Sequence, residues 1–432
     1  MEFKDLIVTP FYLILLYAIA FLIRPYFTKA ETRKYFIPAL TVKFIGAIAV
    51  GIIYQFYYGG GDTFTYFHLG SKWIWEAFLE NPKIAFQLIF GGMEYTTENY
   101  SFASKIYSYG DEASYFVVRF GGILSILSAN TYSTVAVGFA FWSFLGVWQI
   151  YSVFSKIFPN LHKPLAYGIL FLPSLFFWGS GLLKDSITLG ALGFLFHACY
   201  QIIEEKRNVV FYTLIALFMI WIIQIVKIYI LLAFMPAIIY WIYLKFKKFL
   251  KPSILKTLAS PLLLVLFLFV LFISSRNLSQ DSRRYNFEKV LVTAEETAKW
   301  NYYVSDVQGG SGYSLGDYDF SPTGLAKKFV PAVLTTIFRP TLFETRNVVM
   351  LLTAVENLIL FILFLNILRK GNRRFVHSYD ILTFCILFVI LFSFAVGITT
   401  YNFGTLARYR IPMLPFLMVW LIAKQKRYSV SG

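Results

Sequence analysis

The chain has 432 residues, of which 58% are hydrophobic and only 14% are charged, and its mean hydropathy is +0.64. A soluble protein of this length cannot bury so much apolar surface, so the composition excludes a soluble enzyme and indicates a membrane protein. The formal net charge of +16 does not indicate nucleic-acid binding. Most basic residues flank hydrophobic segments, where Lys and Arg orient helices and contact anionic lipid headgroups. We therefore expect membrane lipids as partners and no nucleic acid.

Hydrophobic segments long enough to cross a membrane recur along the whole chain, and we count about eleven of them. We expect an all-α polytopic membrane protein in which residues 1–432 form a single transmembrane domain. The first segment ends at Arg24-Pro25 without a small-residue cleavage site, so we expect it to be retained as a helix. The expected segments are 7–23, 39–58, 131–154, 165–178, 186–203, 208–224, 228–244, 257–275, 347–368, 379–398 and 411–423.

Basic residues are distributed unevenly between the connections of these segments. Short connections on one face hold about half of the 39 Lys and Arg residues, and the positive-inside rule places that face in the cytoplasm. The C-terminus is then cytoplasmic, and residues 59–130 and 276–345 form two long extracytoplasmic loops. Each loop contains a pattern typical of an amphipathic interfacial helix, at 71–80 and at 324–338. The glycine-rich stretch 309–316 predicts a mobile loop over a site.

An acidic residue, Asp62, directly follows three glycines at the outer end of the second segment. The glycines allow a sharp turn of the backbone, and aromatic residues such as Tyr66 crowd the carboxylate on both sides. His68 lies near this position as well. A carboxylate that accepts a hydroxyl proton, with aromatic rings to cover a pyranose, suits a sugar substrate. Alternatively, Asp62 caps the next helix and the aromatic residues form an interfacial belt.

Basic residues at the ends of other segments are candidates for phosphate binding, because ionisable groups at membrane depth are costly and often functional. Lys184 could bind a phosphate that Asp185 orients, or Asp185 could stabilise a helix N-terminus and pair with Lys184. Lys227 marks either a tight turn at the outer surface or a second phosphate contact. Arg339 and Glu344 close the second long loop and could face the same cavity.

A further motif, Arg408-Tyr409-Arg410, comes just before the last segment. Arginine offers bidentate hydrogen bonds to phosphate oxygens and stays charged at membrane depth. Arg408 and Arg410 could therefore neutralise a phosphate leaving group. Alternatively, both side chains anchor lipid headgroups.

Other polar residues give weaker indications. Glu356 and Asn357 lie inside the ninth segment, where an ionisable group normally has a partner, and we expect a packing network there. Asp317-Tyr318-Asp319 has the Asp-x-Asp form that can hold a divalent cation. The sequence otherwise indicates no metal site and no cofactor, since the four His residues form no ligand cluster.

Three stretches resemble parts of known membrane enzymes. Asp62 and Tyr66, in a loop that leads from an early helix into an amphipathic helix, resemble the first outer loop of the GT-C superfamily of polytopic glycosyltransferases. Residues 173–185 and 404–412 resemble stretches of bacterial membrane proteins of glycosyltransferase-like type. The family pattern places the acidic loop after the first helix, whereas here it follows the second; an additional N-terminal helix would account for this. The resemblance implies a GT-C-like fold in a bacterial inner membrane, a polyprenyl-phosphate-linked sugar donor, and Asp62 as catalytic base.

These patterns favour an inverting glycosyltransferase that transfers a sugar from a polyprenyl-phosphate donor to an acceptor at the extracytoplasmic face. Its expected substrate-binding residues are Tyr66, His68, Lys184, Asp185, Lys227, Arg339, Arg408, Tyr409 and Arg410. A Wzy-like polysaccharide polymerase and a non-catalytic scaffold or transport component are the alternatives. The sequence does not identify the sugar, the acceptor or a partner protein.

Overall fold

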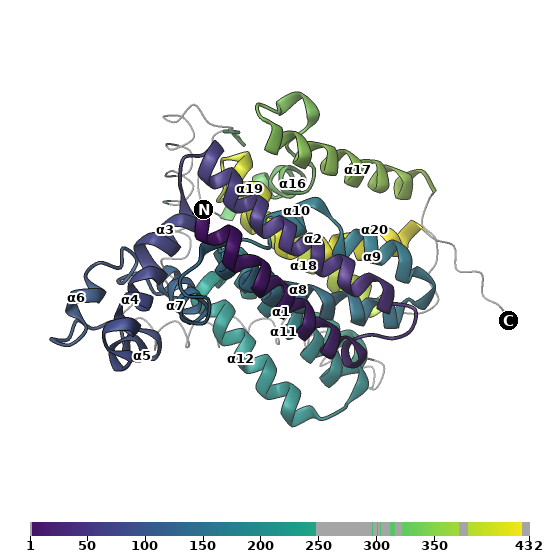
Figure 1. Ribbon diagram of the computed structural model, residues 1–432. Helices are drawn as coiled ribbons and strands as arrows, with labels where there is room; N and C mark the ends of the chain where they lie inside the picture. The colour runs from purple at the N-terminus through teal and green to yellow at the C-terminus, as the bar shows by residue number, and fades with distance from the viewer. Residues whose placement is uncertain are drawn as a thin grey trace. The chain divides into compact units, whose positions relative to one another are not determined.

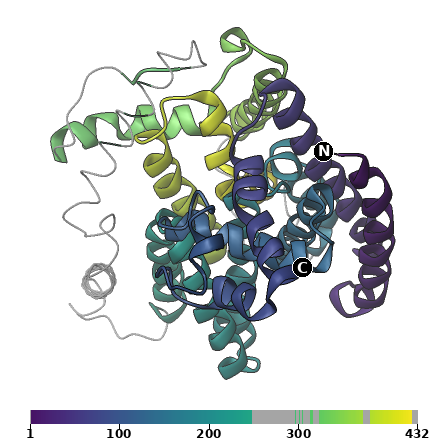
Figure 2. The ribbon, with the colours of Figure 1, turned by 60° about the vertical axis from the view of Figure 1, so that its left-hand side comes forward.

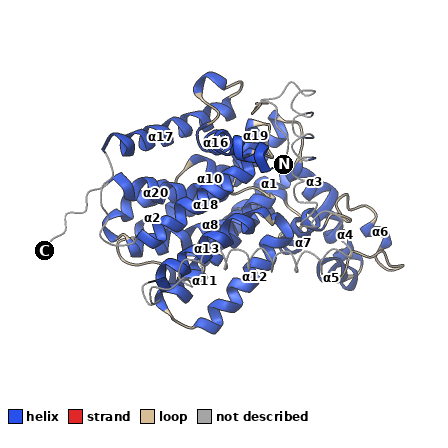
Figure 3. Ribbon diagram, turned by 180° about the vertical axis from the view of Figure 1, so that it is seen from behind, coloured by secondary structure: helices blue, strands red, loops and turns tan. Residues whose placement is uncertain are grey.

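The computed structural model describes residues 2–247, 312–315, 322–370 and 379–425, together with Glu296, Trp300 and Tyr303. These residues form helices and loops (Figure 3), apart from one isolated bridge between Gly312 and Asn402. The described part of the chain contains nine helical segments that are long and apolar enough to cross a membrane, as a polytopic membrane protein requires. The expected segment 257–275 lies outside the described residues, as do Asp317-Tyr318-Asp319 and half of the glycine-rich stretch 309–316. The chain divides into two compact units, Met1–Ile228 and Tyr229–Gly432.

Five long helices and one interrupted helix build the first unit. The long helices are α1 (Phe3–Phe27), α2 (Arg33–Ile52, continued by a π-helical turn over Ile53–Tyr57), α8 (Tyr132–Ile157), α11 (Lys184–Tyr200, continued over Gln201–Glu205) and α12 (Val209–Lys227). Only 11% of the most apolar stretch of α1 is buried, against 72% of that of α8. Figure 2 shows α1, in dark purple, at the edge of this unit. We therefore expect lipid to cover α1, whereas α8 forms the centre of the unit.

Contacts between the helices fix their directions. The backbone N–H of Ser133 donates to Asp5 Oδ1 over 2.8 Å, so α1 and α8 begin at the same end. Lys156 Nζ lies 2.7 Å from Glu205 Oε2, so α8 and α11 finish together at the opposite end. The rings of Tyr35 and Tyr151 make contact near the start of α2 and the end of α8, so these two helices are antiparallel. We call the end at which α1, α8 and α11 begin the Asp62 end.

The segment expected at 165–178 is not one continuous helix. Instead α9 (His162–Leu170) and α10 (Pro173–Phe177) are separated by an interruption at Phe171 and Leu172. Leu172 is extended, with φ −69° and ψ 123°, because a residue before proline avoids the helical region and Pro173 has no N–H for a helical hydrogen bond. Since α8 and α11 both start at the Asp62 end, residues 158–183 return to that end as an interrupted crossing.

Glycines bring α8 and α11 into close contact. A Cβ atom added to Gly193 would lie 2.0 Å from the carbonyl oxygen of Gly146, and one added to Gly146 would lie 2.2 Å from that of Gly190. Small residues of this kind allow the backbones of membrane helices to approach each other closely. This seam holds α11, and with it Lys184 and Asp185, in place against α8.

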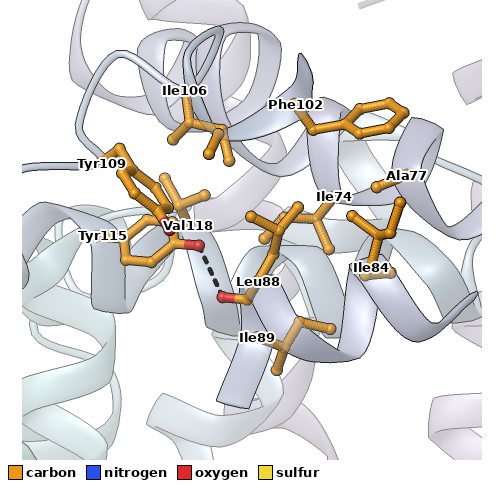
Figure 4. Close-up of a cluster of buried hydrophobic side chains, with 12 residues drawn as sticks. Ile74, Ala77, Ile84, Leu88, Ile89, Phe102, Ile106, Tyr109, Tyr115 and Val118 are labelled. Atoms are coloured by element: carbon orange, nitrogen blue, oxygen red, sulfur yellow. Dashed lines mark hydrogen bonds between the residues drawn. The ribbon is translucent and has the colours of Figure 1, made fainter. Parts of the chain in front are cut away.

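A helical lobe connects α2 to α8 at the Asp62 end (Figure 1). It comprises α3 (Asp62–Tyr66), α4 (Lys72–Glu80), α5 (Pro82–Phe90), α6 (Tyr100–Ala103) and α7 (Glu112–Leu127). The helix expected at 71–80 is confirmed by α4. Its apolar face is covered by protein, because Ile74 and Ala77 pack in a buried cluster with residues of α5 and α7 (Figure 4). Within this cluster Tyr115 OH donates to the carbonyl oxygen of Leu88 over 2.7 Å.

Six described helices make up the second unit. They are α13 (Tyr229–Lys247), α16 (Pro322–Phe338), α17 (Val348–Lys370), α18 (Tyr379–Gly397), α19 (Phe403–Tyr409) and α20 (Leu414–Gln425). A 3₁₀ turn over Ile411–Met413 joins α19 to α20, and together they form one candidate span. Aromatic rings pack α13 antiparallel against α18, as in the pairs Phe234–Phe388 and Trp241–Phe384. The helix expected at 324–338 is confirmed by α16, which continues through Pro331.

Candidate functional site

The three glycines before Asp62 form the expected sharp turn. Gly59, Gly60 and Gly61 have φ angles of +68°, +140° and +123°, in the region that residues with a Cβ atom rarely adopt. The chain therefore leaves α2 abruptly, and α3 begins at Asp62. Gly61, not Asp62, occupies the N-cap position of α3. Asp62 thus does not play the N-cap role of the alternative interpretation.

Asp62 and Tyr66 line a cavity of about 480 Å³ at the surface of the lobe, which we call the Asp62 pocket. The complete lining is Asp62, Thr65, Tyr66, Tyr107, Ser108, Gly110, Asp111 and Ser114. The pocket is thus lined by two carboxylates, by three hydroxyl groups of Ser and Thr, and by two phenol rings. Its volume falls in the range of about 300–1,000 Å³ that is usual for small-molecule sites.

Asp111, which lines this pocket, also pairs with Lys184 at the start of α11. Lys184 Nζ lies 3.7 Å from Asp111 Oδ2, and Ser114 Oγ donates to the same carboxylate oxygen over 2.5 Å. The Lys184 side chain is 23% exposed, so its ammonium group can still reach a ligand. The structure thus brings together Asp62, Tyr66 and Lys184, and it adds Asp111, which the sequence analysis did not consider. The only sequence signal for Asp111 is its place in the same outer loop, directly after Gly110.

Asp185 and Lys227 form a buried ion pair at the start of α11. Lys227 Nζ donates to Asp185 Oδ1 over 2.6 Å, and the two side chains are only 7% and 1% exposed. The partner of Asp185 in this pair is therefore Lys227 of α12, and Lys184 pairs with Asp111. The pair fixes the start of α11 against the end of α12, directly beside Lys184.

His68 lines a different cavity. That cavity has a volume of about 200 Å³ and is also lined by Asp5 and Lys72. The imidazole stacks on the ring of Phe64, with centroids 5.6 Å apart. Burial lowers the pKa of His68 below its usual value, so the ring is neutral at pH 7. The fold therefore separates His68 from the Asp62 pocket.

Lys43 is a polar residue of the first unit that the sequence analysis missed. It lies within α2, is 2% exposed, and its ammonium group donates to Ser143 Oγ (3.0 Å), Leu175 O (2.9 Å) and Gly179 O (2.8 Å). An ammonium group has three donors, and all three are used. The two carbonyl groups belong to the interrupted crossing and the loop that follows it, so Lys43 fixes the chain that leads to Lys184. The signal in the sequence was a single lysine in an otherwise apolar segment.

Arg410 and Glu356 form a buried ion pair in the second unit. The two side chains are 0% and 2% exposed, and Arg410 Nη2 lies 3.2 Å from Glu356 Oε1. Arg410 Nη1 also donates to the carbonyl oxygens of Thr336 and Ile337, and Asn357 Nδ2 donates to that of Pro340. The packing network expected at Glu356 and Asn357 is confirmed, and Arg410 belongs to it.

Arg408 and Tyr409 are both half-buried in the second unit, and the ring of Tyr409 packs against that of Tyr229. Arg339 Nε donates to Glu344 Oε1 over 2.8 Å, and its guanidinium group lies over the ring of Phe403. Burial alone would raise the pKa of Glu344, but hydrogen bonds from Arg339 and Thr341 outweigh it and hold the pKa below its usual value. Glu344 is therefore ionised at neutral pH.

Comparison of the chain with protein-family models, with curated proteins and with solved structures gave no match. Function is therefore argued from the site alone. Within the described ranges no group of three or more His, Cys, Asp or Glu residues could hold a metal ion. What the geometry does supply is a pocket with two carboxylates, aromatic rings and one cation at its side, at the end of a membrane bundle.

Proposed function

We propose that the protein is a membrane glycosyltransferase, which transfers a sugar from a polyprenyl-phosphate donor to an acceptor hydroxyl at the extracytoplasmic face. The observation that carries this proposal is the Asp62 pocket, where an exposed carboxylate shares one cavity with Tyr66 and Asp111, and Lys184 lies beside it. Carboxylates and phenol rings are typical of sugar sites, and a cation suits a phosphate leaving group. The GT-C-like fold, with about eleven crossings in one transmembrane domain, is part of the same proposal.

In the proposed reaction Asp62 accepts the proton of the acceptor hydroxyl. The acceptor oxygen then forms a bond to the anomeric carbon of the donor sugar, while the bond from that carbon to the phosphate oxygen breaks. The electron pair of the broken bond leaves on the phosphate, whose charge Lys184 stabilises. Attack from the side opposite to the leaving group inverts the anomeric centre. Tyr66 and Tyr107 cover the faces of the sugar, and Asp111 orients Lys184.

The arginines of the second unit take no part in the proposed reaction, which uses residues of the first unit only. The phosphate contact of Arg408 stays a prediction from the chemistry of its guanidinium group. Arg410 has no exposed side-chain surface and is paired with Glu356, so we assign it a positioning role. Arg339 is paired with Glu344, and the ring of Tyr409 packs against that of Tyr229.

The test of the proposal is an assay of sugar transfer by the purified protein in proteoliposomes. Its donors are polyprenyl phosphates that each carry one radiolabelled hexose or pentose, and its readout is the release of free polyprenyl phosphate. Asp62→Asn keeps the shape of the side chain but removes the proton acceptor, so we expect transfer to fall by about a hundredfold to ten-thousandfold. Glu80→Gln, which changes an exposed carboxylate of α4 outside the pocket, is the matched control. Equal rates for the wild-type protein and Asp62→Asn would remove the catalytic assignment.

A second candidate function, transport of a lipid-linked sugar, is favoured by a different observation. The first unit contains an interrupted crossing bound to the buried Lys43, and the second contains the interrupted span Phe403–Gln425 with the buried Arg410. Interrupted helices with buried charges are typical of transporters. The same proteoliposomes distinguish the two functions, since a transporter moves the labelled lipid between leaflets without breaking its sugar–phosphate bond. A Wzy-like polymerase would instead yield products of several repeat units.

A further inference from the structure

A cavity of about 670 Å³, which we call the wedge, lies between α16 and α17 in the second unit. Its walls are mainly apolar and include Phe338 of α16 and Leu358, Phe361 and Phe364 of α17. Leu358 and Phe361 are each 42% exposed although they belong to a candidate membrane span. In a membrane this wedge is therefore open to lipid, and its walls match hydrocarbon chains.

One end of the wedge is polar. Asn357 lines it and is 1% exposed, and its Oδ1 atom has no hydrogen-bond partner in the described structure. The Nδ2 atom of the same side chain donates to the carbonyl oxygen of Pro340, which places Asn357 beside Arg339. A buried carbonyl oxygen without a donor is unfavourable. The wedge thus presents an unused acceptor that a ligand with an N–H or O–H group would satisfy.

Two opposite charges accompany that acceptor. Arg339 lines the same wedge and forms an ion pair with Glu344, which it contacts through Nε and Nη2. No hydrogen bond from Arg339 Nη1 to the described residues is found, so this nitrogen keeps its donors for a ligand. Because Glu344 is ionised, the pair presents one cation and one anion with no net charge.

We infer that this wedge binds one phospholipid with an ethanolamine headgroup. Its acyl chains lie against Phe338, Phe361 and Phe364, its phosphate accepts from Arg339, and its ammonium group donates to Asn357 Oδ1 on the side of Glu344. A zwitterionic headgroup complements the Arg339–Glu344 pair without adding net charge. The site is separate from the Asp62 pocket, and the inference holds whether or not Asp62 is catalytic.

Other membrane lipids fit this set of polar groups less well. A choline headgroup has the same charges but no N–H, so it leaves Asn357 Oδ1 without a donor. A glycerol headgroup supplies hydroxyl donors but adds a net negative charge beside Glu344. A polyprenyl phosphate at neutral pH offers mainly acceptor oxygens, and these suit Arg339 but not Asn357. We therefore expect affinity to fall from ethanolamine to glycerol to choline headgroups.

The test uses the purified full-length protein in detergent, freed of bound lipid, and measures lipid binding by native mass spectrometry. The probes are phosphatidylethanolamine and its N-methyl, N,N-dimethyl and N,N,N-trimethyl derivatives with identical acyl chains. The first three keep at least one N–H donor and the last has none. We expect similar binding of the first three and a drop of about tenfold or more at the last step, which corresponds to loss of one charge-assisted hydrogen bond.

Variants of α17 complete the test. Asn357→Leu removes the acceptor, so the affinity for the three lipids that carry an N–H donor should fall. All four lipids should then bind this variant equally. Asn366→Leu, on the same helix but outside the wedge, is the matched control. Equal binding of all four lipids to the wild-type protein would overturn the inference and leave a wedge that takes any lipid. Stronger binding of a polyprenyl phosphate than of phosphatidylethanolamine would also overturn it.

Discussion

The side-chain nitrogen of Lys43 lies 2.9 Å from the carbonyl oxygen of Leu175, on the five-residue helix α10. Helix α10 ends at Phe177, so the carbonyl groups of Leu175 and Gly179 at and beyond its end need donors other than helical N–H groups, and the interior of a membrane offers no water to replace them. Lys43 supplies the missing donors from a neighbouring helix. Gly46, one turn further along α2, lets the backbone of Phe176 approach, because a Cβ atom there would lie 1.9 Å from Phe176 O.

We predict that Lys43→Met destabilises the protein. The substitution keeps the length of the side chain but leaves Leu175 O without its donor, whereas Gly179 O still accepts from Ser143 Oγ. A buried polar group left without a partner costs about 1–3 kcal/mol. Thermal unfolding in detergent, followed by the loss of soluble protein, measures the effect. Lys83→Met is the control, because Lys83 is 76% exposed. Equal midpoints for both variants would mean that the crossing does not depend on Lys43.

A second prediction concerns the buried pair Asp185–Lys227. Lys227→Met leaves the Asp185 carboxylate buried without its cation, and removing one partner of such a pair typically costs about 3–5 kcal/mol. Combining it with Asp185→Asn should cost less than the sum of the single changes, because the buried charge is then absent. Unfolding midpoints of the four proteins form a double-mutant cycle. Additive effects would show that the two side chains do not interact.

The topology of the first unit gives a third prediction. Ser104 in the lobe and Lys163 at the start of α9 are both exposed and lie at opposite ends of the unit. In intact cells, an impermeant thiol reagent should label Ser104→Cys, and should label Lys163→Cys only after the membrane is opened. Cys199→Ser and Cys385→Ser provide a background without native thiols. Labelling of Lys163→Cys in intact cells would invert the orientation and move the Asp62 pocket to the cytoplasm.

The ion pair between Arg339 and Glu344 gives a pH-dependent prediction. Because the pKa of Glu344 is lowered in the folded protein, the pair stabilises the fold above the unfolded pKa of about 4.3. This stabilisation is lost as the pH falls through the folded pKa. The unfolding midpoint of Glu344→Gln should therefore lie below that of the wild-type protein at pH 7, and the two should converge towards pH 3. A constant difference over this range would contradict the assignment.

The parts of the fold that were predicted correctly depend on local patterns. The turn at Gly59–Gly61 follows from glycine alone, and α4 follows from the spacing of its apolar residues. The interruption at Leu172 was missed although Pro173 is visible in the sequence, since apolar residues on both sides of it resemble one continuous segment.

Pairings between distant residues were less accessible. Asp111 meets Lys184, and Lys227 meets Asp185, only because the packing of α7, α11 and α12 brings these residues together. Lys43 was missed for a related reason: a single lysine does not interrupt an apolar segment, and its three partners all lie about 100 positions or more away in the sequence. Which charges are paired is therefore decided by helix packing, which one sequence does not reveal.

The buried Arg410–Glu356 pair has a consequence for the way the protein is made. Glu356 precedes Arg410 by 54 positions, so α17 leaves the ribosome well before its partner has been synthesised. During that interval a carboxyl group lies inside an inserted helix without its cation, at a cost of about 3 kcal/mol or more. We expect α17 to stay beside the insertion machinery until Arg410, at the end of α19, has been synthesised. In chains that end before Arg410, the carboxyl group of Glu356 would remain without its cation. We expect quality-control proteases to degrade such chains.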